Sequence, residues 1–322
     1  MNPDSRIYVA GHLGLVGSAL MRQLRARGYR HLVTRTHAEL DLTDQSAIQD
    51  FFAREKPEYV LLAAARVGGI HANATYPAEF IQQNLAIQTN VIHEAWRNKV
   101  KRLLFLGSSC IYPKDCPQPI REEYLLTGEL EPTNRPYALA KIAGIEMCWS
   151  YNRQYGTRYI AAMPTNLYGP NDNYDLASSH VLPALIRKMH EARLNGASEV
   201  VVWGTGTPRR ELLYSDDMAD ACLYLMEQQE ERLQSLFNDT QPPLVNVGCG
   251  EDISIRDLAE LVKSVVGFTG SFTFDASKPD GTPRKLLDVS RLHGLGWRAE
   301  TRLQQGLVQA YADFRSCLAP IG

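Results

Sequence analysis

The chain has 322 residues, a formal net charge of -2 and 44% hydrophobic residues, a composition typical of a soluble globular protein. It contains no run of Lys and Arg, which excludes the electrostatic signature of nucleic-acid and membrane-surface binders. No apolar run approaches the roughly 18–20 residues of a membrane span, and the start of the chain shows no signal-peptide pattern. We therefore expect a cytoplasmic protein without nucleic-acid or membrane partners.

The six cysteines include no C-x-x-C pair of the kind that zinc and redox sites use. A chain of this size does not need disulfides for stability, so we expect reduced thiols and no bound metal. Five of the cysteines are interpreted as buried structural residues. Cys110 is a catalytic candidate because of the motif in which it stands.

Short apolar runs alternate with longer amphipathic segments through the first half of the chain. Continuous β-branched and leucine-rich runs predict strands of a parallel sheet that is buried on both faces. The expected strands are 7–10, 31–34, 59–63, 102–106 and 159–163, and the expected helices are 15–28, 44–55, 77–98 and 136–154. Right-handed crossovers then give an α/β, doubly wound parallel sheet of the Rossmann type.

The second half of the chain has a less regular pattern. A polar stretch over 171–179, a helix over 181–193 and a Gly-Thr-Gly-Thr-Pro turn over 204–208 suggest a smaller lobe. Neither a linker nor an internal repeat separates the halves. We predict a cofactor-binding Rossmann domain over 1–170 and a mainly substrate-binding lobe over 171–322, with about 207–250 returning to the first domain.

Three glycines, Gly11, Gly14 and Gly17, lie between the first expected strand and the first expected helix. Glycine at this turn lets the backbone approach a pyrophosphate, whose charge then rests on the amide groups of the helix N-terminus. Glycines at such a turn also serve as plain packing devices. The strand before them and the helix after them favour a dinucleotide site.

Arg35 and His37 follow the second expected strand, where NAD-binding folds carry a carboxylate for the ribose hydroxyls. The guanidinium of arginine matches the geometry of a phosphate group. The acidic residues Glu39 and Asp41 come too late in the chain to reach the ribose. NADP(H) is therefore the expected cofactor.

Tyr137 and Lys141 stand one helical turn apart on the same face of an expected helix. A nearby cation favours phenolate, so the spacing predicts a lowered tyrosine pKa and a group that exchanges a proton with a carbonyl oxygen. Ser108 follows the strand that ends at the same sheet edge, where its hydroxyl can share that carbonyl. The alternative is a solvated pair on a surface helix.

Around these residues the sequence becomes specific to one family. It resembles the GDP-L-fucose synthases, which are extended short-chain dehydrogenases/reductases, and the resemblance runs from the first strand nearly to the C-terminus. In addition to the glycine loop, the matching blocks are 107–113, 130–134, 137–144, 163–170, 200–206 and 278–285.

The resemblance implies a reaction in two stages on GDP-4-keto-6-deoxy-D-mannose. Epimerisation at C3 and C5 is followed by NADPH-dependent reduction at C4, with Ser108, Tyr137 and Lys141 serving the reduction. Cys110 is implied as the base and His180 as the acid of the epimerisation, since thiol and imidazole have suitable pKa values. Apart from the resemblance, Cys110 is interpreted as a small buried residue and His180 as a loop histidine.

The resemblance also implies which residues bind ligands and that the enzyme is a homodimer. The position of Leu13 holds arginine in many relatives, which predicts weaker binding of the 2′-phosphate. The implied substrate residues are Lys188, Trp203, Arg210, Asp280 and Lys285, although Trp203 and Arg210 also suit plain core and surface roles. The implied cofactor residues are Gly11, His12, Leu13, Gly14, Leu15, Val16, Gly17, Arg35, His37, Asp41, Leu42, Ala64, Leu106, Gly107, Lys141, Pro164, Thr165, Asn166, Leu167 and His180.

Two other functions fit the same motifs. A nucleotide-sugar 4-epimerase or 4-reductase would use the same fold without needing a base and an acid on opposite faces of the sugar ring. A cofactor-sensing protein without catalysis is the more remote alternative, because such proteins usually lose the tyrosine or the lysine that this chain keeps.

Overall fold

A six-stranded parallel sheet forms the centre of the molecule in a computed structural model that describes residues 1–176, 178–278 and 280–318. The strand order is β2-β1-β3-β4-β5-β9. The strands are β1 (Arg6–Ala10), β2 (His31–Val33), β3 (Tyr59–Leu62), β4 (Arg102–Leu106), β5 (Tyr159–Pro164) and β9 (Leu244–Val247). The order changes direction between β1 and β3, where open α/β sheets form a crevice at the carboxyl ends of their strands.

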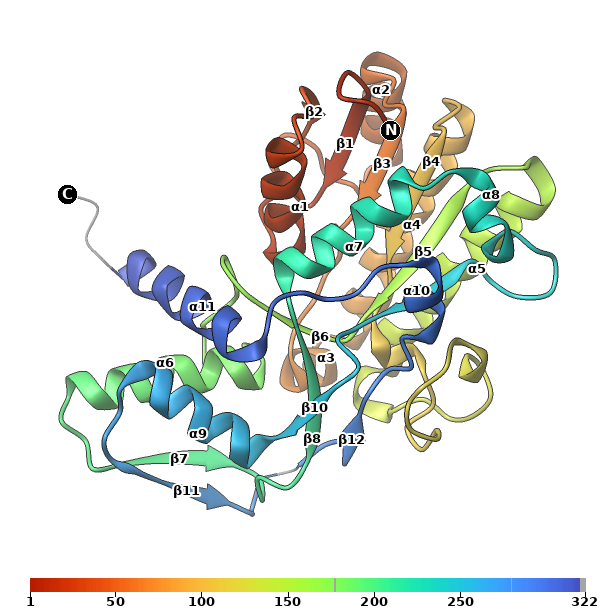
Figure 1. The fold of residues 1–322 in the computed structure, drawn as a ribbon. Coiled ribbons are helices and arrows are strands. Elements are labelled where there is room, and N and C mark those ends of the chain that lie inside the picture. Colours follow the sequence, from red (N-terminus) through yellow and green to blue (C-terminus); the bar gives the residue numbers. More distant parts are fainter. Residues whose placement is uncertain (177, 279, 319–322) are drawn as a thin grey trace.

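Helices cover both faces of this sheet (Figure 1). On one face, the apolar sides of α1 (Leu15–Ala26) and α7 (Ser215–Glu227) pack on the strands. The other face is covered by α2 (Gln45–Glu55), α4 (Pro77–Arg97) and α5 (Arg135–Tyr155). The prediction of a doubly wound parallel sheet is confirmed, and burial on both faces explains why its strands are continuous apolar runs.

A second group of elements packs around its own apolar core below the carboxyl ends of the strands (Figure 1). Its helices are α6 (Val181–Leu194), α9 (Ile255–Val266) and α11 (Leu303–Leu318). In its first sheet, β8 (Arg209–Tyr214) pairs with β6 (Asn166–Tyr168), β10 (Asp252–Ser254) and β12 (Arg284–Lys285). Its second sheet joins β7 (Glu199–Trp203) to β11 (Ser271–Asp275). The division of the chain at residue 170 remains a prediction.

The expected elements end within two residues of the observed ones. The largest difference is at α1, which ends at Ala26 instead of continuing to Gly28. Gly28 has a φ of +79°, so the helical hydrogen-bond pattern cannot pass through it. The short helices α3 (Ile70–Thr75), α8 (Glu230–Leu233) and α10 (Ser290–Leu295) had not been expected, and neither had the longer helices α7, α9 and α11. No helix in the described part of the chain is long and apolar enough to cross a membrane.

Candidate active site

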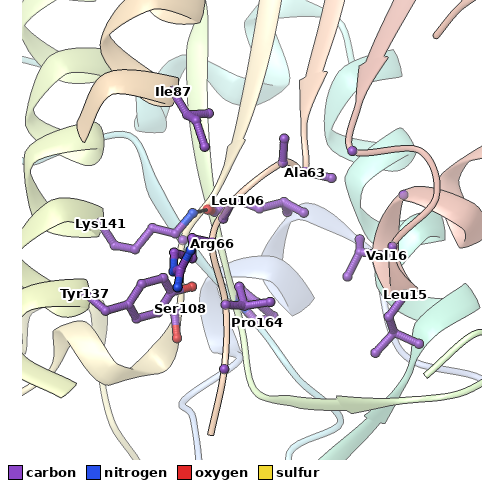
Figure 2. A pocket seen from close by; sticks show the side chains of 18 of the residues that line it. Leu15, Val16, Ala63, Arg66, Ile87, Leu106, Ser108, Tyr137, Lys141 and Pro164 are labelled. Carbon is purple, nitrogen blue, oxygen red and sulfur yellow. Dashed lines mark hydrogen bonds between the residues drawn. The ribbon is translucent and has the colours of Figure 1, made fainter. Parts of the chain in front are cut away.

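A cavity of about 700 Å³ opens at the carboxyl ends of the parallel strands. The loops that follow β1, β2, β3, β4 and β5 all contribute to its wall, as do Tyr137 and Lys141 from α5. Figure 2 shows Leu15 and Val16 at the start of α1 on one side of the cavity and the two α5 residues on the opposite side. The cavity therefore occupies the crevice that the strand order predicts.

The glycine loop brings backbone, without side chains, to one wall of the cavity. A Cβ added to Gly17 would lie 1.9 Å from the carbonyl oxygen of Gly11, and one added to Gly11 would lie 2.7 Å from the amide of Ala64. The helix that follows starts at Leu15 without a side-chain cap, which leaves its first amide groups for another acceptor. The residues present thus fit the pyrophosphate of a dinucleotide.

Arg35 and His37 both line the cavity, yet their environments differ. The guanidinium of Arg35 pairs with Glu55 at 2.6 Å and donates to the carbonyl of Thr34 at 2.7 Å. The side chain of His37 is 84% exposed and lies 3.9 Å from Asp41. The guanidinium of Arg35 is therefore already held by an acid, whereas the side chain of His37 is open to solvent.

Ser108, Tyr137 and Lys141 meet at the end of β4 (Figure 2). The ammonium of Lys141 donates to the carbonyl of Leu106 at 2.8 Å and lies 5.8 Å from the centre of the Tyr137 ring. Tyr137 is hydrogen-bonded to Ser108, whose Oγ also accepts from the amide of Cys110 at 3.5 Å. The serine hydroxyl and the phenol thus face the same part of the cavity.

Burial changes the expected protonation of this group. It raises the pKa of Tyr137 above its ordinary value, and the hydrogen bond with Ser108 only partly opposes the change. It also lowers the pKa of Lys141 to about 8. The prediction that the neighbouring cation gives Tyr137 a lowered pKa is therefore wrong for this environment. Tyr137 is a protonated phenol at neutral pH and can donate a hydrogen bond to a ketone oxygen.

Cys110, His180 and Lys285 line the same cavity. Burial raises the pKa of the Cys110 thiol, and the positive charges of Lys285 and Lys141 oppose that change. Burial of the imidazole also lowers the pKa of His180, in the same direction as the charge of Lys285, although the residue as a whole is exposed. Desolvation is the largest of these effects, so the thiol pKa lies above its ordinary value despite the two cations.

The other expected substrate residues lie outside the wall of this cavity, whereas Lys285 is part of it. Trp203 is 62% exposed, and the ammonium of Lys188 lies 5.2 Å from its ring centre. Asp280 accepts from the amide and hydroxyl of Thr205 at 2.7 and 2.8 Å. Arg210 donates to backbone carbonyls, including that of residue 282 at 2.6 Å. Two of these side chains are therefore already engaged in fixing local backbone.

Of the expected cofactor residues, eighteen line the cavity, and His12 and Leu13 do not. Leu13 is 63% exposed, and its carbonyl accepts from the side-chain amide of Asn171 at 2.5 Å. Tyr214 and Asp175 of the second half also lie away from the wall. Tyr214 is buried and donates to Gln309 at 2.6 Å, while Asp175 accepts from the Ser178 amide in the loop before His180.

A further residue connects the parts of the site. Glu211 is fully buried, and its carboxylate accepts from the amides of Gly250 and Leu287 at 2.7 and 2.9 Å. Its backbone carbonyl accepts from the side chains of Thr165 and Asn166, which line the cavity. Burial raises the pKa of Glu211, and the two amides oppose the change. This residue therefore links the end of β5 to the segment that carries Lys285.

The comparison with known proteins decides the family. The sequence model of the NAD dependent epimerase/dehydratase family matches residues 7–248, which include the glycine loop and the Tyr137–Lys141 pair. The chain belongs to this family. A dinucleotide site at the carboxyl edge of the sheet is what membership implies, and the backbone geometry around Gly17 fits it.

Several family members are similar along almost their whole length. The chain is 60% identical to GDP-L-fucose synthase 1 of Arabidopsis thaliana over 96% of this chain and 92% of that protein. It is 58% identical to GDP-L-fucose synthase of Escherichia coli (strain K12), with 96% of each covered. Among solved structures, GDP-mannoheptose C4 reductase from Campylobacter jejuni with NADP bound has a TM-score of 0.88 and 40% identity, covering 98% of this chain and 99% of that one.

Some wall residues of this family member had not been expected. Arg66 lines the cavity after β3 and pairs with Glu79 at 2.6 Å. Asn73 and Asn134 also line it, and the amide oxygen of each is buried without a hydrogen-bond partner among the described residues. The position of Arg66 directly after the Ala63-Ala-Ala run at a strand end was the signal that could have identified it.

The described residues contain no group of three or more His, Cys, Asp or Glu side chains that could hold a metal ion. The titratable side chains of the cavity wall are instead single groups of different kinds, with a thiol, a phenol, an imidazole and two ammonium groups near the end of β4. Such a set suits proton transfer beside a carbonyl group.

Proposed function

We propose that the chain converts GDP-4-keto-6-deoxy-D-mannose to GDP-L-fucose, by epimerisation at C3 and C5 followed by reduction at C4. The observation that carries the proposal is the presence of Cys110 and His180 in one cavity with Ser108, Tyr137 and Lys141. The names and high identity of the two GDP-L-fucose synthases support it. The substrate specificity of this chain follows from these relatives and not from the cavity alone.

The first stage needs a base and an acid, because C3 and C5 both lie beside the C4 ketone. The thiolate of Cys110 takes a proton from one of these carbons, and the electron pair of the broken C–H bond moves to the ketone oxygen. Ser108 and Tyr137 donate hydrogen bonds to that oxygen and stabilise the enolate. His180 then gives a proton to the opposite face of the carbon, and the ketone re-forms with inverted stereochemistry.

The second stage uses the protonated phenol. The cofactor supplies a hydride to C4. Tyr137 gives its proton to the O4 atom, while its hydrogen bond with Ser108 orients the phenol and the ammonium of Lys141 lies 5.8 Å from the centre of its ring. The raised pKa of Tyr137 suits this step, because a ketone that receives a hydride must also receive a proton.

We infer that NADP(H) is the preferred cofactor. The support is the guanidinium of Arg35 in the cavity wall, the lack of a carboxylate at the tip of β2, and the NADP that the C4 reductase binds. Leu13 supplies no charge, and the guanidinium of Arg35 is already paired with Glu55. We therefore infer only a modest preference for NADP(H) over NAD(H). Lys188, Trp203, Arg210 and Asp280 are proposed as contacts of the GDP moiety beyond the cavity wall.

A homodimer in the cytoplasm is proposed as the state of the enzyme. The exposed apolar side chains of Leu139 and Tyr155 on the outer face of α5 support an interface there, and Tyr155 stacks on Trp96 of α4 at a ring-centre distance of 4.3 Å. Sedimentation equilibrium of the wild type and of a Tyr155→Glu variant tests this assembly. A wild-type monomer would contradict it.

The C4 reductase at 40% identity favours a second candidate, a 4-reductase that leaves C3 and C5 unchanged. The test is turnover of GDP-4-keto-6-deoxy-D-mannose with NADPH or NADH, with product identification by NMR. The proposal requires GDP-L-fucose as the product. It also requires that wild-type enzyme in D₂O without cofactor exchanges the C3 and C5 protons, and that Cys110→Ser and His180→Gln lose this exchange. A D-sugar product would establish the 4-reductase.

A further inference from the structure

Lys285 stands on a short strand that is fixed from both sides. Within β12 it pairs with Arg210 of β8, and the carbonyl of the next residue, Leu286, accepts a hydrogen bond from the amide of Ile120 at 2.8 Å. The amide of Leu287 is held by Glu211 at 2.9 Å. These bonds fix the backbone at Lys285, so its side chain enters the cavity from a defined point.

The ammonium of Lys285 has no hydrogen bond or ion pair to any described residue. Its interactions are long-range ones with Cys110, Arg210, Cys116 and Glu131, of which that with Cys110 is the largest. Burial lowers the pKa of this ammonium, and the neighbouring thiol opposes the change. Lys285 is half-buried, and a partly desolvated cation without a carboxylate partner carries a cost that a nearby thiolate would offset.

The positive charge of Lys285 affects the pKa values of both Cys110 and His180, the two groups of the proposed epimerisation. For Cys110, Lys285 is the largest influence that lowers the thiol pKa, ahead of the hydrogen bond from Ser108 and the charge of Lys141. For His180, Lys285 is the one charged group with a resolved influence, and it lowers the imidazole pKa. Tyr137 faces Cys110 from α5 and stays neutral at ordinary pH, so it adds no charge.

We propose that Lys285 is a positioning residue for the epimerisation, which acts through Cys110 by favouring its thiolate and through His180 by making its proton easier to release. The role of Lys285 in epimerisation rests on the proposed function. Its influence on the Cys110 thiol does not, because that influence is present in the enzyme without substrate. Lys141 does not take this role, because its ammonium is committed to the carbonyl of Leu106 at 2.8 Å.

The proton balance of each inversion fits this arrangement. Cys110 begins as thiolate and ends as thiol, while His180 begins as imidazolium and ends as neutral imidazole. One proton leaves the sugar carbon and one arrives, and Lys285 keeps its own proton throughout. Exchange with solvent then returns Cys110 and His180 to their starting protonation states, and the exposure of residue His180 gives water access to the pair.

The test measures how fast iodoacetamide alkylates Cys110 between pH 6 and 10, with mass spectrometry of the peptide that carries it. Lys285→Met removes the charge and keeps the length of the side chain, and Lys285→Gln is a second uncharged variant. Lys285→Arg keeps the charge. Lys278→Met is the control, because this lysine lies on the same loop but near the Trp203 ring, at 5.5 Å from its centre.

At pH 8 we expect alkylation of Cys110 to be at least about tenfold slower in the Met and Gln variants, since loss of an opposite charge changes a pKa by about one unit or more. Lys285→Arg and Lys278→Met should keep the wild-type rate. A merely structural role predicts the opposite sign, because water that enters a loosened cavity would relieve desolvation and speed the reaction. Unchanged or faster alkylation in Lys285→Met would overturn the inference.

Proton exchange at C3 and C5 separates this inference from the proposed function. If wild-type enzyme shows no exchange but Lys285→Met still slows alkylation, the epimerase assignment fails and the electrostatic link between Lys285 and Cys110 stands. If exchange occurs and alkylation is insensitive to Lys285, the epimerase assignment stands and the inference fails.

Discussion

The guanidinium of Arg35 is paired with the carboxylate of Glu55 at 2.6 Å, although Arg35 lines the wall where a 2′-phosphate would bind. Since Glu55 neutralises the cation, we predict that Glu55→Gln lowers the KM for NADPH about fivefold and leaves the KM for NADH unchanged. Steady-state kinetics with both cofactors provide the measurement. Glu58→Gln is the control, because Glu58 pairs with Lys101 away from the cavity. An equal change for NADH would contradict the prediction.

Gly17 and Gly14 should differ sharply in their tolerance of alanine. A Cβ at Gly17 would lie 1.9 Å from the carbonyl oxygen of Gly11, whereas the nearest atom to a Cβ at Gly14 is 3.5 Å away. We predict that Gly17→Ala weakens cofactor binding at least about a hundredfold, because a backbone shift is needed, and that Gly14→Ala changes it less than about fivefold. Quenching of intrinsic fluorescence by NADPH measures both constants. Similar losses in both variants would show that the space around the loop is not decisive.

The reduction should depend on pH through Lys141, whose pKa burial lowers to about 8. The ammonium is present below that pH and is lost above it, so kcat for NADPH oxidation should fall as pH rises through about 8. Lys141→Arg should move the fall to higher pH, because arginine stays charged. Lys141→Met should reduce kcat by about a hundredfold or more. A fall at the same pH in Lys141→Arg would assign it to another group.

Asp172 should make the stability of the protein depend on pH. Its Oδ2 is buried without a hydrogen-bond partner among the described residues, and burial raises its pKa to about 7 from 3.8. Because the folded-state pKa is the higher one, its stabilising effect is present below about pH 4 and is lost as pH rises to about 7. Between pH 5 and 7.5, wild type should lose about 2 kcal/mol relative to Asp172→Asn.

Urea unfolding of both proteins at the two pH values measures this difference. The exposed residue Asp50 provides the matched control, and Asp50→Asn should keep a constant offset from wild type. A pH-independent offset for Asp172→Asn as well would show that the carboxyl group ionises normally in the folded protein.

The parallel sheet could be predicted because its strands are buried on both faces and are therefore apolar throughout. The run over Arg102–Leu106 was predicted to the residue for this reason. The two-residue strand β12 has no such pattern, since its pairing with β8 depends on backbone groups that are distant in sequence. The family resemblance therefore assigned Lys285 to the substrate, and the sequence could not reveal that Lys285 lines the same cavity as Cys110.

The sequence predicted which side chains meet in the site, but it did not predict their pKa values. Residue types and spacing brought Ser108, Tyr137 and Lys141 together correctly in one cavity. Their protonation depends on how deeply the surrounding protein buries them, and a spacing of four residues in the sequence carries no information about burial. Desolvation therefore reversed the expected direction for Tyr137, and for Cys110 it exceeded the effect of the nearby cations.

Glu211 receives hydrogen bonds from the segment after Lys285 and, through its carbonyl, from the side chains at the end of β5. A single buried residue thus holds together two stretches of backbone that reach the same cavity, one after β5 and one at β12. In the proposed reaction in two stages, both steps would take place between walls whose spacing this one residue helps to set.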